Sequence, residues 1–81
     1  MKKILMVLSQ YRVCERILPT IPKLSKKYNL DCYLIYQMSR KHQWPGDNDP
    51  RKYFYQTYSK DFKKIFDEEN PSFNDYDLIL T

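Results

Sequence analysis

Five consecutive apolar residues near the N-terminus, Ile4 to Leu8, restrict the fold of this chain more than any other feature. The run lacks the alternation of apolar and polar residues that a strand with one solvated face shows. Its length suits a strand, and its uniform apolar character is typical of a strand that is covered on both faces in a parallel sheet. We therefore predict a buried strand over residues 3–9.

Two more strands and a loop are predicted further along the chain. Residues 30–38 are rich in side chains that favour strands, and residues 75–81 form a short apolar segment that is entered through a polar turn. Residues 39–49 are polar and contain proline, glycine and asparagine, so they predict a loop.

Apolar residues recur every three or four positions between these strands and predict two helices. The first covers residues 13–28, where Pro19 and Pro22 predict an irregular first turn because a proline inside a helix removes a backbone hydrogen bond. The second covers residues 50–69, and Asp49-Pro50 is a suitable helix start. The apolar stripe of this second helix consists of Phe54, Tyr55, Tyr58, Phe62, Ile65 and Phe66.

Strands separated by helices favour right-handed crossovers and parallel pairing. We therefore predict the α/β class, with a three-stranded parallel β-α-β-α-β unit in one partial domain. In the strand order 3-2-1 both helices lie on one face and leave the other bare, whereas in the order 2-1-3 each face is half covered. Because the first strand requires cover on both faces, we expect an incomplete domain that is completed by a further part of the chain or by a second subunit.

Charge and cysteine usage narrow the class of protein. The formal net charge of +4 favours anionic partners, but the positive charge is spread out and interleaved with acidic residues, as on a mildly basic solvated face. No stretch has the roughly 20 apolar residues of a membrane span, and the first apolar run is too short for a secretory signal. Cys14 and Cys32 predict buried, reduced thiols in a cytoplasmic protein.

Polar and basic residues follow the first two predicted strands. Because ligands of open α/β sheets bind at the carboxyl ends of the strands, this edge predicts a site for an anion such as a phosphate or a sugar acid. The candidates for acceptor or phosphate contact are Arg12, Arg16, Arg40, Lys41 and His42. The alternative for the same residues is an ordinary solvated loop.

Several kinds of site are not expected. His42 is the only histidine, so neither a metal site nor a cofactor is predicted. Residues 9–12 contain no glycine, which argues against dinucleotide binding at the first crossover. Trp44 is interpreted as a loop anchor, with stacking on a sugar or a base as the alternative. The tyrosines of residues 50–69 are interpreted as core packing rather than as a nucleic-acid surface.

The segments KKILMVL (residues 2–8), ILPTIPKL (17–24) and YDLILT (76–81) resemble the start of GT-B glycosyltransferases and of the related sugar-nucleotide 2-epimerases. The resemblance implies two Rossmann-like domains, of which the first mainly binds the acceptor and the second the nucleotide sugar. It also implies peripheral contact with a membrane through a basic surface. The turn SQYR at residues 9–12 departs from the small or glycine-containing turn of that family, and no catalytic residue can be carried over.

We therefore expect an N-terminal, acceptor-side part of a GT-B-like glycosyltransferase that is inactive by itself. The alternative is a non-enzymatic Rossmann-like module that pairs with another subunit. The expected partners are the remaining part of the chain or a second subunit, an anionic acceptor or nucleotide sugar, and the inner face of the membrane, but not nucleic acid. Response-regulator receivers share the YDLIL strand, yet this chain lacks their acidic pair after the first strand.

Overall fold

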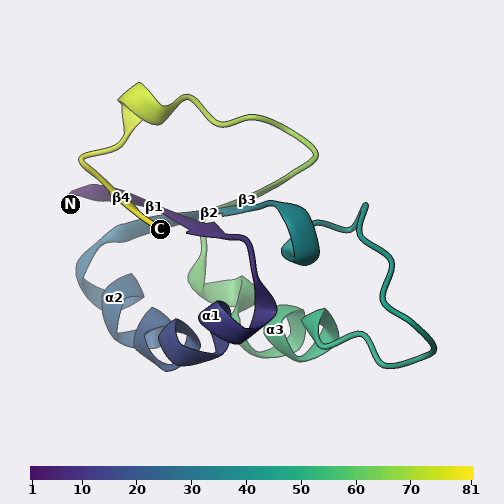
Figure 1. Ribbon diagram of the computed structural model, residues 1–81. Coiled ribbons are helices and arrows are strands. Elements are labelled where there is room, and N and C mark those ends of the chain that lie inside the picture. Colours follow the sequence, from purple (N-terminus) through teal and green to yellow (C-terminus); the bar gives the residue numbers. More distant parts are fainter.

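Four parallel strands form one sheet in the order β3-β2-β1-β4 in the computed structural model, which describes residues 1–81 (Figure 1). The central strand β1 (Lys3–Leu8) pairs with β2 (Asn29–Leu34) on one side and with β4 (Leu78–Leu80) on the other. The edge strand β3 (Lys64–Asp67) pairs with β2. The predicted α/β class and parallel pairing are confirmed, whereas the prediction of three strands is wrong.

All three α-helices lie on one face of the sheet (Figure 1). The chain passes from β1 to β2 through α1 (Tyr11–Ile17) and α2 (Ile21–Lys27), and from β2 to β3 through α3 (Arg51–Tyr58). Two right-handed crossovers that step in the same direction place their helices on the same face. The three strands that the sequence predicted therefore lie in the order 2-1-3, because residues 78–80 pair with β1, whereas both helical connections lie on one face, as was expected only for the order 3-2-1.

The connection from β3 to β4, residues 68–77, crosses the opposite face of the sheet (Figure 1). The Tyr33 hydroxyl donates to Asn70 Oδ1 at 2.9 Å, and the rings of Tyr33 and Phe73 lie 6.1 Å apart. Leu5, in the centre of the sheet, is 0% exposed. For the order 3-2-1 the sequence predicted that this face would be bare. Residues 68–77 cover its centre.

Proline divides the predicted helix over residues 13–28. A 3₁₀ turn, Leu18–Thr20, separates α1 from α2, and each proline lies in the first two positions of the element that follows. A proline is tolerated there because its missing amide has no partner in a first turn. The expected irregularity therefore lies in the middle of the stretch, and the first turn is regular.

The predicted helix over residues 50–69 is wrong beyond Tyr58. A 3₁₀ turn, Ser59–Asp61, follows α3, and the chain then forms β3. The Lys63 amide donates to the Leu30 carbonyl at 2.8 Å, so pairing with β2 outweighs the helical spacing of the apolar residues. Three residues of the predicted apolar stripe, Phe54, Tyr58 and Phe62, are buried in the core as expected. Tyr55 is 37% exposed, which contradicts the prediction, and Ile65 and Phe66 are only partly buried.

The other predicted strands are shorter than expected. The strand predicted over residues 30–38 ends at Leu34, because Tyr36 adopts a positive φ of 50° and the chain forms a 3₁₀ turn through Met38. The strand predicted over residues 75–81 pairs only at residues 78–80, and the strand predicted over residues 3–9 ends at Leu8.

The core fills the space between the sheet and the helix layer. Alternate residues of β1 and β2 point into it, and the helices cover them with buried side chains. The main contributors are Ile4, Met6, Leu8, Leu30, Cys32, Leu34, Cys14, Ile21 and Phe54. Cys14 and Cys32 are free and buried, as the sequence predicted. Burial raises the pKa of Cys14 to about 11 and also raises that of Cys32, which disfavours the reactive thiolate form of both. No helix has the length and the apolar character needed to cross a membrane.

Candidate functional site

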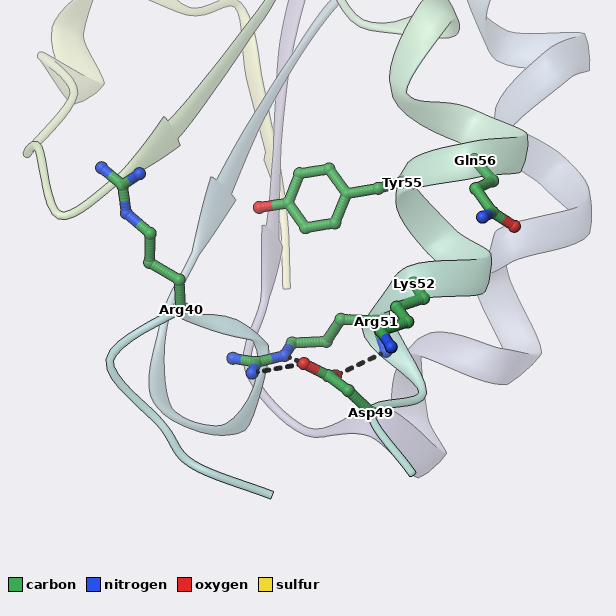
Figure 2. Close-up of a pocket in the computed structure, with 6 residues that line it drawn as sticks. All are labelled: Arg40, Asp49, Arg51, Lys52, Tyr55 and Gln56. Atoms are coloured by element: carbon green, nitrogen blue, oxygen red, sulfur yellow. Dashed lines mark hydrogen bonds and ion pairs between the residues drawn. The ribbon is translucent and has the colours of Figure 1, made fainter. Parts of the chain in front are cut away.

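A hollow of about 270 Å³ opens at the carboxyl ends of β2 and β3, beside the first two turns of α3 (Figure 2). Strands of a parallel sheet end at one edge, and the chain that leaves this edge after β2 returns to it at the start of α3. The hollow is therefore formed by the crossover from β2 to β3, which contains α3. Its lining residues are Arg40, Asp49, Arg51, Lys52, Tyr55 and Gln56.

The base of the hollow is an ion pair between Arg51 and Asp49. The Arg51 Nε and Nη2 atoms lie 2.8 and 2.7 Å from the two carboxylate oxygens, and the Arg51 backbone amide donates to Asp49 Oδ1 at 3.0 Å. The Arg51 side chain is only 9% exposed, and its Nη1 donates to the Ser39 carbonyl. The hydrogen bonds from Arg51 lower the pKa of Asp49, so both charges are compensated.

The Asp67 carboxylate, at the end of β3, lies next to the hollow and bonds to two of its lining residues, Arg40 and Tyr55. It accepts hydrogen bonds from the Ser39 hydroxyl at 3.0 Å, the Arg40 amide at 3.2 and 3.3 Å, and the Tyr55 hydroxyl at 3.3 Å. Burial and the charge of Asp67 raise the pKa of Tyr55 to about 12. At neutral pH the Tyr55 hydroxyl is therefore a hydrogen-bond donor and does not act as a base.

Two cationic side chains of the hollow face solvent. The Arg40 guanidinium is 3.2 Å from Glu68 and 4.0 Å from Asp67, but the side chain is 67% exposed, so these contacts contribute little. Lys52 makes no ion pair at all. Because Asp49 and Asp67 are already satisfied, Arg40 and Lys52 are the groups left to hold an anion.

A second hollow, of about 370 Å³, continues from the first towards the loop after β2 and shares Arg40, Asp49, Arg51 and Lys52 with it. Its additional lining residues are His42, Gln43, Trp44, Gly46 and Asp47. The Trp44 Nε1 donates to the Gln37 carbonyl at 3.3 Å, so this tryptophan joins the loop to the chain that follows β2.

The structure brings together only part of the site that the sequence predicted. Arg40 lines both hollows and His42 lines the second. Lys41 is exposed, and its amide donates to the Ser39 hydroxyl, but its side chain lines neither hollow. Arg12 and Arg16 are exposed on α1 and also lie outside both hollows.

Five residues of the site were missed by the sequence analysis: Asp49, Arg51, Lys52, Tyr55 and Asp67. The spacing of Asp49 and Arg51 across a helix start was a usable signal, because an aspartate there accepts from the next turn. Asp67 had no such signal, since residues 64–67 were assigned to a helix and the end of a strand was not expected there.

Compared with protein-family models, with curated proteins and with solved structures, the chain has no match.

Proposed function

We propose that this chain is a Rossmann-like unit that binds a phosphate-bearing acceptor at the carboxyl edge of its sheet, as the acceptor-side part of a GT-B-like glycosyltransferase. One observation carries the proposal: Arg40 and Lys52 line a hollow whose carboxylate, Asp49, is already paired with Arg51. The neighbouring Asp67 carboxylate already accepts hydrogen bonds from Ser39, Arg40 and Tyr55. An incoming anion meets the unpaired Lys52 there, and at Arg40 it competes only with the weak, exposed contact to Glu68.

The topology supports the Rossmann-like part of the proposal. The order β3-β2-β1-β4 is the order of the first four strands in a doubly wound sheet, and such sheets bind ligands at their carboxyl edge. Ser9 and Gln10 follow β1 in place of the glycines that admit a pyrophosphate. The first crossover therefore favours an acceptor over a dinucleotide.

The chemistry of the hollow supports a binding role without catalysis. Tyr55 is held in its protonated form, and the Asp49 carboxylate is neutralised by Arg51. Asp67 accepts from three different residues, so neither Asp49 nor Asp67 is a free base. In the proposal the catalytic groups come from another part of the enzyme.

The test is a titration of the ¹⁵N-labelled protein with inorganic phosphate at low ionic strength, followed by NMR. Amide shifts are expected at the end of β2 and the start of α3, and Arg40→Ala and Lys52→Ala are each expected to weaken binding about three- to tenfold. Lys23→Ala, which removes an exposed lysine on α2, is the matched control. Equal phosphate affinity in the Arg40, Lys52 and control variants would overturn the proposal.

A second candidate function is an interaction module that pairs with another subunit or with a further part of the chain. It is favoured by an apolar hollow of about 390 Å³ between α2 and β4, next to the open edge of β4. Leu78 and Ile79 on that edge are 50% and 37% exposed. Sedimentation of the wild type and of Ile79→Lys tests it: a concentration-dependent dimer that the variant abolishes supports pairing, and a wild-type monomer at all concentrations contradicts self-pairing.

The separation of charge between the two faces supports the proposed contact with a membrane. Residues 11–27, in the helix layer, carry five basic side chains and one acidic one, whereas residues 64–81 carry five acidic side chains and one basic one. The basic helix layer suits an anionic lipid surface. Co-sedimentation with phosphatidylserine vesicles at low salt is expected, and Lys23→Glu with Lys26→Glu is expected to abolish it. Equal pelleting with neutral vesicles would contradict the proposal.

A further inference from the structure

The two hollows at the carboxyl edge form one depression with two chemically different ends. They share Arg40, Asp49, Arg51 and Lys52, and only the second hollow reaches His42 and Trp44. One end therefore offers cations and the other end offers aromatic surface. A ligand that fills both ends needs a charged group and a flat or ring-shaped apolar surface.

The aromatic end is held in place before any ligand arrives. Trp44 donates its Nε1 hydrogen to the Gln37 carbonyl, and its ring meets Tyr11 and His42 edge-on at centroid distances of 6.3 and 5.0 Å. Trp44 also lines a third hollow, beside Pro50, so its ring is accessible from more than one side. A fixed ring loses little conformational entropy when a ligand packs on it.

Polar groups without partners surround this ring. The Gln43 amide and the Asp47 carboxylate line the same hollow as Trp44, and both side chains are exposed with no hydrogen bond or ion pair. A carboxylate and an amide can accept from, or donate to, the hydroxyl groups of a sugar. The ring, the amide and the carboxylate together suit a sugar, which has an apolar face and a rim of hydroxyls.

The loop that follows Trp44, at the aromatic end of the depression, leads back to the start of α3. Gly46 has a positive φ of 68°, a conformation that residues with a Cβ atom rarely adopt, and it turns the loop between Trp44 and Asp49. Both ends of the depression are thus connected by a short stretch of chain whose course depends on this glycine.

We propose, on the basis of the anion site described above, that the ligand is a sugar phosphate whose phosphate contacts Arg40 and Lys52 and whose ring packs on Trp44. The sugar hydroxyls bond to Gln43 and Asp47. Phosphate alone fills only the cationic end, so the ring adds binding free energy and determines which phosphates are accepted.

The only tryptophan of the chain reports on this site directly, because Trp44 fluorescence responds to a ring that packs on it. Glucose 1-phosphate, inorganic phosphate, methyl glucoside and uridine monophosphate are titrated under the same conditions. We expect glucose 1-phosphate to bind about three- to tenfold more tightly than phosphate and to change the fluorescence, which phosphate leaves nearly unchanged.

Single substitutions distinguish the contribution of the sugar ring to binding from that of the phosphate. Gln43→Ala and Asp47→Ala change the exposed loop and leave the Trp44 hydrogen bond intact. Calorimetry is expected to show that each variant binds glucose 1-phosphate more weakly than the wild type does, with unchanged binding of inorganic phosphate. Trp44→Phe is expected to reduce the preference for the sugar phosphate while the circular dichroism spectrum stays the same.

The outcomes distinguish this inference from the proposed function. If inorganic phosphate binds and glucose 1-phosphate binds no more tightly, the proposed anion site is supported and the sugar phosphate is rejected as its ligand. Tighter binding of uridine monophosphate than of glucose 1-phosphate also overturns the assignment of the ring as a sugar. If neither phosphate nor glucose 1-phosphate binds, the proposed function itself fails.

Discussion

The guanidinium of Arg51 binds the carboxylate of Asp49, two residues before it, through N–O distances of 2.8 and 2.7 Å. The same guanidinium donates to the Ser39 carbonyl beyond the end of β2. One side chain thus joins the start of α3 to the chain that leaves the sheet. The geometry of the proposed anion site depends on this connection, because Ser39 precedes Arg40 and Lys52 follows Arg51.

Asp49→Asn is expected to lower the free energy of unfolding at neutral pH by about 1–3 kcal/mol, because it leaves the buried Arg51 without its counter-charge. Pairing lowers the pKa of Asp49 in the folded state, so its contribution is present above about pH 4 and is lost as the pH falls through the lowered pKa. Urea unfolding at several pH values is expected to show the two proteins converging in acid. Asp47→Asn, at an exposed residue without an ion pair, is the control, and a difference between wild type and Asp49→Asn that stays constant with pH contradicts the pairing.

Tyr55→Phe removes the hydroxyl that donates to Asp67 and is expected to cost about 1 kcal/mol at neutral pH. The raised pKa of Tyr55, about 12, means that its contribution is complete below the unfolded value of about 10 and is lost as the pH rises from there through the folded pKa. Denaturant unfolding in alkaline solution is therefore expected to show wild type losing stability faster than the variant. Parallel losses in the two proteins would exclude Tyr55 as the titrating group.

Tyr76→Phe tests how firmly the β3–β4 connection is attached to the sheet. The Tyr76 hydroxyl donates to Asp31 Oδ2 at 2.6 Å, and burial together with that hydrogen bond raises the pKa of Tyr76. Loss of the hydroxyl leaves a half-buried carboxylate without this donor, so about 1–2 kcal/mol of stability is expected to disappear. Tyr36→Phe, at a side chain that is 75% exposed, is the control and is expected to change urea stability very little. Similar losses in both variants would argue against a specific role for the Tyr76 bond.

Both cysteines are expected to react with a thiol reagent only when the chain opens. Cys14 and Cys32 are buried and free, and burial raises the pKa of each. The labelling rate in native buffer is expected to follow the opening equilibrium and to rise steeply with urea, whereas both thiols react at once in denaturant. Rapid labelling of either thiol in native buffer would show that the helix layer does not cover it as described.

Uniform apolar runs and prolines were the reliable signals in this sequence. The run from Ile4 to Leu8 indicated the central strand because only a strand covered on both faces tolerates it. Pro19 and Pro22 indicated a break in the first helix, although the break falls one turn later than expected. Both features depend on local sterics and on burial, so they can be recognised in a single sequence.

The edge strand β3 was not predictable from its own residues. Ile65 and Phe66 continue the helical spacing that begins at Phe54, and they also suit a strand whose two faces are each partly covered. The choice between the two depends on the free edge of β2, a contact with residues far away in the sequence. Because residues 64–67 were predicted as helix, Asp67 was not expected at the end of a strand beside the site. Arg40 was predicted as a site residue because it follows a strand that was predicted.

The position of β1 in the middle of the sheet has a consequence for folding during synthesis. The Lys3 amide donates to Asp77, 74 residues away, and one edge of β1 pairs only with β4. At about 5–20 residues per second, the ribosome takes about 4–15 s to supply that partner after β1 has been made. During this interval the central strand of the sheet has an open edge, which is a template for pairing with another chain until β4 has been made.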